Sequence, residues 1–82
     1  MTMKLIMNDD RLLEGTPLEI VRAMQSLAFG VQDLAVPAYI AWVAANALRF
    51  EDVALTVTGE TDAERAASLI DEMVRTGLAY RG

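Results

Sequence analysis

The stretch from residue 3 to residue 19 reads MKLIMNDDRLLEGTPLE, and it decides how the fold begins. Residues 3, 5 and 7 are Met or Leu, and this period of two is typical of a strand with one buried face. Asn8, Asp9 and Asp10 follow as a turn cluster, because Asn and Asp tolerate left-handed backbone and bond to their own main chain. The chain returns over residues 11–14, so the stretch predicts a β-hairpin.

A helix start follows the hairpin directly. Thr16 lies at the N-cap, Pro17 at the first helical position and Glu19 at the third, and together they form a capping box. We predict a helix from Pro17 to Phe29, ended by Gly30 in left-handed backbone. Its buried stripe is expected to be Ile20, Val21, Met24, Leu27 and Ala28, with Glu19, Arg22, Gln25 and Ser26 facing away.

A second helix is predicted from Pro37 to about Arg49 or Phe50, and Asp33 is an alternative N-cap for an earlier start. This helix is apolar almost all round, so it needs cover on more than one side. Its expected core stripe is Ile40, Val43, Ala44, Ala47 and Leu48. A second line, at spacings of three, four and three residues, consists of Tyr39, Trp42, Asn46 and Arg49.

Residues 53–58, VALTVT, alternate large apolar residues with small or polar ones and are rich in β-branched side chains. This pattern predicts the clearest strand of the chain. Thr61 and Glu64 then form a second capping box, which begins a third helix. The core stripe expected for this helix is Ala66, Leu69, Ile70, Met73 and Val74.

The end of the third helix carries two further patterns. Asp71 lies four residues before Arg75, the favourable order for a helical ion pair. Gly77 followed by Leu78 is typical of a Schellman motif, and residues 78–81 are a candidate short edge strand. The predicted order is β-β-α-α-β-α: one α+β domain over residues 1–82, whose three-stranded sheet, of open strand order, carries the helices on one face.

Composition excludes most catalytic chemistry. The chain has 82 residues, a net charge of −5, and neither Cys nor His. Disulfides, thiolate metal sites and Cys or His nucleophiles are therefore excluded, and the clustered carboxylates are better explained as solvated or helix-capping charges. We expect no enzyme activity, no cofactor and no metal site.

Charge and hydropathy also limit the partners. An acidic surface repels nucleic-acid phosphates, so no direct nucleic-acid binding is expected. The longest uncharged run, residues 34–48, is too short to span a bilayer, and residues 1–7 lack the features of a signal peptide. We expect a cytoplasmic protein without membrane binding. Because 54% of the residues are hydrophobic, more than so small a domain hides, a protein partner is expected to cover part of them.

The line Tyr39, Trp42, Asn46 and Arg49 is the candidate partner-binding face. Trp, Tyr and Arg are the residue types enriched at interface hot spots, because they offer a large rigid area with a polar group. In the alternative interpretation, Trp42 packs against the hairpin or the loop after the first helix, and Arg49 only extends to water. The pattern leaves both interpretations open.

Two segments resemble known small proteins. The opening MKLIMNDDRLLEGTPLEIVRAM, a hairpin running into a helix that begins TPxEIV, and the later TGETDAERAASLIDEMVRTGLA resemble small uncharacterised proteins of bacteria and their mobile elements. In size and charge the chain is also similar to phage-encoded inhibitors of the anti-CRISPR type. The resemblance implies no activity and no binding residue.

The leading hypothesis is a non-enzymatic protein-binding module that acts as a small acidic inhibitor. Its carboxylates at the hairpin turn and at the start of the third helix would imitate phosphates and block a basic, nucleic-acid-handling partner. These residues are Asp9, Asp10, Glu60, Asp62 and Glu64. The alternative is a homo-oligomeric structural or accessory protein, in which the Tyr39 to Arg49 face meets its symmetry mate in a homodimer. A small-ligand binder or enzyme using carboxylates with Arg49 or Arg22 ranks last.

Overall fold

Three strands form one antiparallel sheet in the computed structural model, which describes residues 2–82. The central strand, β1 (Met3–Met7), pairs on one side with β2 (Leu12–Gly15) and on the other with β3 (Ala79–Arg81), in the order β2-β1-β3. The predicted hairpin is therefore confirmed, and so is the short edge strand near residue 80. Ile6 faces Leu12 across one pairing and Tyr80 across the other, so both ends of the chain meet in this sheet.

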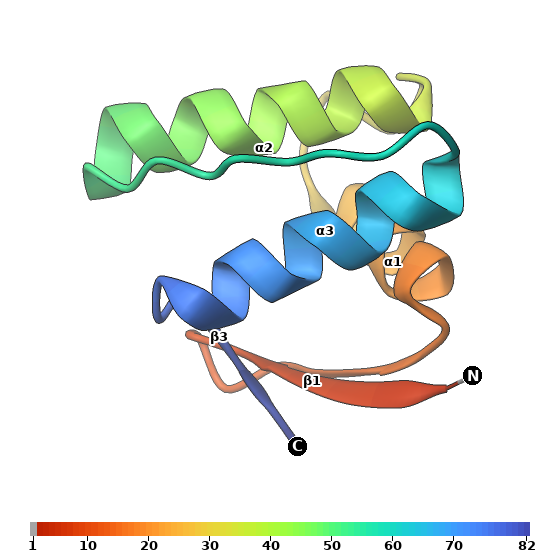
Figure 1. Cartoon of the computed structure of the whole chain (residues 1–82), viewed down its shortest axis with the longest axis vertical. Coiled ribbons are helices and arrows are strands. Elements are labelled where there is room, and N and C mark those ends of the chain that lie inside the picture. Colours follow the sequence, from red (N-terminus) through yellow and green to blue (C-terminus); the bar gives the residue numbers. More distant parts are fainter. Residues whose placement is uncertain (1) are drawn as a thin grey trace.

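Three helices lie on one side of the sheet (Figure 1). They are α1 (Pro17–Leu27), α2 (Val36–Glu51) and α3 (Asp62–Arg75). α1 and α3 cover the sheet, and α2 packs on α3 as an outer layer. The largest fully buried side chains come from the sheet and the two inner helices: Leu5, Ile20, Val21, Leu69 and Ile70. The α+β class and the helices on one face are as predicted. None of the described helices combines the length and the hydropathy that crossing a membrane requires.

Both predicted capping boxes are present. The Glu19 N–H donates to Thr16 Oγ1 at 3.2 Å, and the Thr16 N–H donates to Glu19 Oε1 at 2.9 Å. Thr61 and Glu64 make the same reciprocal pair, at 3.1 and 3.0 Å, at the start of α3. The backbone N–H groups hold the pKa of both glutamates below its ordinary value. Each box satisfies N–H groups that a helix start leaves without partners.

The strand predicted over residues 53–58 is wrong. This segment is extended, with alternating half-buried and exposed residues, and it runs along α2 without pairing to any strand (Figure 1). Side chains of α3 accept hydrogen bonds from part of its backbone: Glu72 Oε1 accepts from the Thr56 N–H at 2.9 Å, and Ser68 Oγ accepts from the Thr58 N–H at 3.0 Å. The sheet takes β3 as its third strand instead, so the order is β-β-α-α-α-β.

The ends of the first two helices differ from the prediction. α1 ends at Leu27, because Ala28 is already extended, and Phe29 is 97% exposed. Gly30 has a positive φ of 83° but lies in the following loop. α2 begins at Val36, and its N-cap is Ala35 without a side-chain hydrogen bond, so Asp33 does not cap it.

The buried stripes of these helices are also shifted. Leu27 and Leu48 are more than half exposed, whereas Gln25 and Tyr39 are buried. The loop between α1 and α2 covers Gln25, which was predicted to face water, and the Gln25 amide donates to the loop carbonyls of Val31 and Leu34. The amphipathic pattern identified the helices but not the exact rotation of their ends.

The end of α3 follows the predicted Schellman motif. The Leu78 N–H donates to the Met73 carbonyl at 2.9 Å, and Gly77 has a φ of 81°. The predicted pair of Asp71 and Arg75 is wrong. Arg75 instead binds Glu72, with Nε 2.8 Å from Oε2, because Asp71 forms an ion pair with Arg81 of β3.

Candidate protein-binding groove

A groove of about 300 Å³ lies between the hairpin turn and the second half of α2. Its walls are Met7 and Asn8 from the hairpin, Trp42, Asn46 and Phe50 from α2, and Leu78 from the turn before β3. Met24, Tyr39 and Met73 lie at its floor and are buried. Segments far apart in the sequence therefore build one apolar surface, which we call the α2–hairpin groove.

Tyr39 and Trp42 form a stacked pair within this groove. Their ring centroids are 5.9 Å apart with an interplanar angle of 23°. Tyr39 is 2% exposed, and burial raises the pKa of its hydroxyl to about 12, whereas Trp42 is 39% exposed. The core interpretation of this aromatic line therefore fits Tyr39, and the exposed-face interpretation fits Trp42. The buried Tyr39 ring supports the Trp42 ring, which faces solvent.

Asn46 and Arg49 complete the predicted face in different ways. Asn46 is half-buried and lines the groove. Arg49 is exposed, and its guanidinium carbon lies 5.2 Å from the centroid of the Phe50 ring, a cation–π arrangement at the rim. Phe50 itself is 70% exposed. The structure thus brings Tyr39, Trp42 and Asn46 together, with Arg49 beside them.

The acidic residues predicted as one surface form two separate groups. Asp9 and Asp10 lie in the hairpin turn, next to Asn8 and thus beside the groove. Asp9 is 3.8 Å from Arg11, while Asp10 sits in left-handed backbone with a φ of 69°. No ion pair of residues 2–82 involves Asp10.

The second group lies at the start of α3, whose 14 residues separate it from the groove end of that helix by about 21 Å. Here the Glu64 carboxylate accepts from backbone N–H groups, and Asp62 is 3.4 Å from Arg65. Within the described residues, Glu60 makes no ion pair. Two of these three carboxylates are therefore already engaged in holding the helix.

Several groove residues were not predicted. Met7, Asn8 and Leu78 reach it only because the hairpin and the turn before β3 pack beside α2, and no local pattern signals that. Phe50 and Glu51 were detectable in principle, because Phe50 lies four residues after Asn46 and continues the same helical face.

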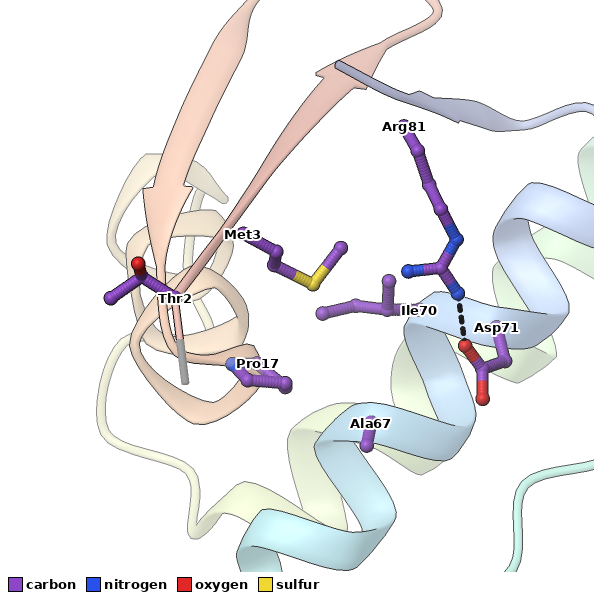
Figure 2. Close-up of a pocket in the computed structure, with 7 residues that line it drawn as sticks. All are labelled: Thr2, Met3, Pro17, Ala67, Ile70, Asp71 and Arg81. Atoms are coloured by element: carbon purple, nitrogen blue, oxygen red, sulfur yellow. Dashed lines mark hydrogen bonds and ion pairs between the residues drawn. The ribbon is translucent and has the colours of Figure 1, made fainter.

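A smaller hollow of about 200 Å³ lies on the other side of the molecule, between the start of β1, the start of α1 and α3 (Figure 2). Its lining is mostly apolar, with Met3, Pro17 and Ile70 among the residues drawn. Its two charged residues, Asp71 and Arg81, are bound to each other. Across residues 2–82, no three acidic side chains converge in a way that could hold a metal ion.

The groove and this hollow thus differ in chemical character: the first is large, aromatic and bordered by acids, and the second is small and closed by an ion pair. Comparison with protein-family models, with curated proteins and with solved structures finds no match.

Proposed function

We propose that this chain is a non-enzymatic protein-binding module that receives a basic, amphipathic segment of another protein in the α2–hairpin groove. The observation that carries the proposal is the open aromatic wall of Trp42 and Phe50, which nothing else in residues 2–82 covers. Large exposed apolar surface on a small domain is typical of an interaction site. Trp42 is also preorganised, because it stacks on the buried ring of Tyr39.

The charges around the groove favour a basic partner. Asp10, Glu51 and Asp52 border it or follow its lining residues, and none of them forms an ion pair within residues 2–82. Of the nearby cations, Arg11 pairs with Asp9, and Arg49, which lies over the Phe50 ring, keeps its charge at the rim, so among the described residues the unpaired carboxylates outnumber the unpaired cation. Unpaired carboxylates around an apolar groove attract a segment whose Lys or Arg side chains flank apolar anchors.

The groove also suits a helical partner. Met7, Met24 and Met73 contribute to it, and methionine side chains adapt to different apolar shapes. An amphipathic helix inserts anchors at spacings of three and four residues into such a groove. The module would act as an inhibitor where the basic segment that it covers is one that holds nucleic acid.

A synthetic amphipathic helix of Leu and Lys tests this function, with calorimetry as the readout for every variant and Trp42 fluorescence as a second readout where Trp42 is present. We expect the Leu–Lys helix to bind and a Leu–Glu helix of the same length not to bind. Trp42→Ala and Phe50→Ala should each weaken binding by roughly five- to thirtyfold, or about 1 to 2 kcal/mol, as for truncation of an important interface side chain. The matched control is Leu12→Ala, because Leu12 is 56% exposed on the outer face of the sheet. Equal losses for Leu12→Ala, or binding of the Leu–Glu helix, would contradict the proposal.

Symmetric self-association is a second candidate, favoured by the outward face of α2. Leu48 on this face is 58% exposed, and Ala41 and Ala45 beside it are also exposed. Two such faces could meet across a two-fold axis as an isologous contact. Sedimentation equilibrium decides it: a single monomer mass at tens of micromolar excludes a homodimer as the working form.

A further inference from the structure

Residues 53–58 form an extended segment with the composition of a strand but without a strand beside it. The residues alternate between half-buried Val53, Leu55 and Val57 and exposed Ala54, Thr56 and Thr58. In Figure 1 the segment follows the length of α2 as a separate extended trace. Uncharged, β-branched segments of this kind pair readily with other strands.

One edge of this segment is occupied by side chains of α3. Backbone groups of successive residues point to opposite edges of an extended chain, so the N–H groups of Thr56 and Thr58, two residues apart, point to the same edge. Glu72 accepts the first and Ser68 the second. The spacing fits, since four residues of helix rise about 6 Å and two residues of strand about 6.6 Å.

In the part of the chain that the structure describes, the opposite edge makes no hydrogen bonds at Leu55 and Val57. Leu55 and Val57 direct their N–H and C=O groups to it, and no hydrogen bond within residues 2–82 uses any of these groups. The Val53 N–H, at the beginning of the segment, donates to the Ala47 carbonyl at 3.1 Å. The edge without hydrogen bonds therefore offers two N–H donors and two carbonyl acceptors, from Leu55 and Val57, which are two residues apart.

We propose that this edge binds an extended segment of a partner protein whose apolar residues are flanked by Lys or Arg. Strand addition supplies the missing backbone partners, and alternating side chains give the specificity. The charges beside the segment favour Lys or Arg at both ends of the partner strand. Asp52 precedes the segment and Glu60 follows it, and within the described residues neither forms an ion pair. This edge is a different surface from the α2–hairpin groove, with Asp52 lying between the two, and the inference does not rest on the proposed function.

A second copy of this chain is a poor occupant of the same edge. An antiparallel register that bonds Leu55 to the partner's Val57, and Val57 to the partner's Leu55, is centred on Thr56. It places Asp52 opposite the partner's Glu60 twice, and like charges directly opposite destabilise a strand pair. A strand of another protein with Lys or Arg at both ends would instead be attracted by Asp52 and Glu60.

The probe is the nine-residue peptide Lys-Val-Thr-Val-Thr-Val-Thr-Val-Lys, whose two Lys face Glu60 and Asp52 in an antiparallel register. The readout is amide hydrogen exchange followed by NMR. In the free protein the amides of Leu55 and Val57 should exchange faster than those of Thr56 and Thr58, which are already bonded. With the peptide, exchange of Leu55 and Val57 should slow by about tenfold or more at saturation, and a peptide with Glu in place of both Lys should have no effect.

Matched double variants test the charge selection. Asp52→Asn with Glu60→Gln should weaken the peptide by roughly three- to tenfold. Asp10→Asn with Glu14→Gln makes the same change in net charge on the hairpin, outside the segment and its two flanking residues, and should leave the affinity almost unchanged. Asp52 and Asp10 are both left-handed, with φ of 55° and 69°, and Asn tolerates this backbone, so both variants should fold.

Three results would overturn the inference. If the Leu55 and Val57 amides are as protected as the Thr56 amide without peptide, the edge is already bonded within the protein. If their protection rises with protein concentration alone, the occupant is a second copy of the chain. Equal weakening by the two double variants would show that only the overall charge acts. Trp42→Ala should not alter this peptide's effect on Leu55 and Val57, which separates this surface from the groove.

Discussion

Gln25 is the buried polar residue that holds the loop between α1 and α2. It is 7% exposed, and its Nε2 donates to the carbonyls of Val31 at 2.8 Å and Leu34 at 2.7 Å. Both acceptors belong to a segment without regular structure, whose backbone groups have few other partners. One side chain thus fixes the path from α1 to the start of α2, and with it the position of the groove-forming helix.

Gln25→Glu removes both donors and places a carboxylate against two carbonyl oxygens. We expect it to lower the free energy of unfolding at neutral pH by more than Gln25→Ala, which should cost about 2 to 3 kcal/mol because buried carbonyls lose their partners. Urea unfolding of the three proteins measures this. Ser26→Ala serves as the control, since Ser26 is exposed on the same helix. A Gln25→Ala variant as stable as the unchanged protein would show that the amide does not hold the loop.

At the scale of elements, the Glu72 side chain of α3 makes two interactions, one within the helix and one with the extended segment. The Glu72 carboxylate binds the Arg75 guanidinium at 2.8 Å within the helix and accepts the Thr56 N–H of the extended segment. Arg75 first, and the Thr56 N–H second, lower the pKa of Glu72 from its ordinary value of 4.5 to about 2. The helix thereby replaces the neighbouring strand that the segment lacks.

This lowered pKa predicts an acid-dependent loss of stability. The folded protein holds Glu72 ionised to lower pH than the unfolded chain, so its contribution is complete above pH 4.5 and disappears as the pH falls towards about 2. Glu72→Gln should remove this part of the pH dependence. Unfolding curves of both proteins between pH 5 and 2.5 should therefore converge at the acid end. A constant difference across that range would contradict the role of the ionised carboxylate.

At the scale of the whole molecule, the sheet pairs the first strand of the chain with the last one. Residues 5–7 of β1 pair with residues 79–81 of β3, so the first and last strands of the chain lie side by side. Ala79 is completely buried in this sheet, while the Asp71–Arg81 ion pair outside it is exposed. Backbone pairing and burial, more than the ion pair, should hold β3 in place.

Deleting residues 79–82 tests this pairing. We expect the deletion to lower the free energy of unfolding by roughly 2 to 4 kcal/mol, because β1 loses hydrogen-bond partners and the core loses the cover of Ala79. Arg81→Ala keeps the strand and removes only the exposed ion pair, so it should cost less than about 1 kcal/mol. Thermal unfolding of both proteins provides the comparison, and similar losses would assign the effect to the ion pair.

The sequence alone determined the features that depend on neighbours in the chain. The hairpin turn, both capping boxes and the Gly77 stop were predictable, because each is made within a few residues. Tertiary structure decided the rest. Residues 53–58 have the composition of a strand, but β1 already pairs with β2 on one side and β3 on the other. Glu72 and Ser68 accept the Thr56 and Thr58 N–H groups, so the segment is extended without belonging to the sheet. The groove divides in the same way: Trp42 and Asn46 were visible as a helical line, but Met7, Asn8 and Leu78 joined them only through packing.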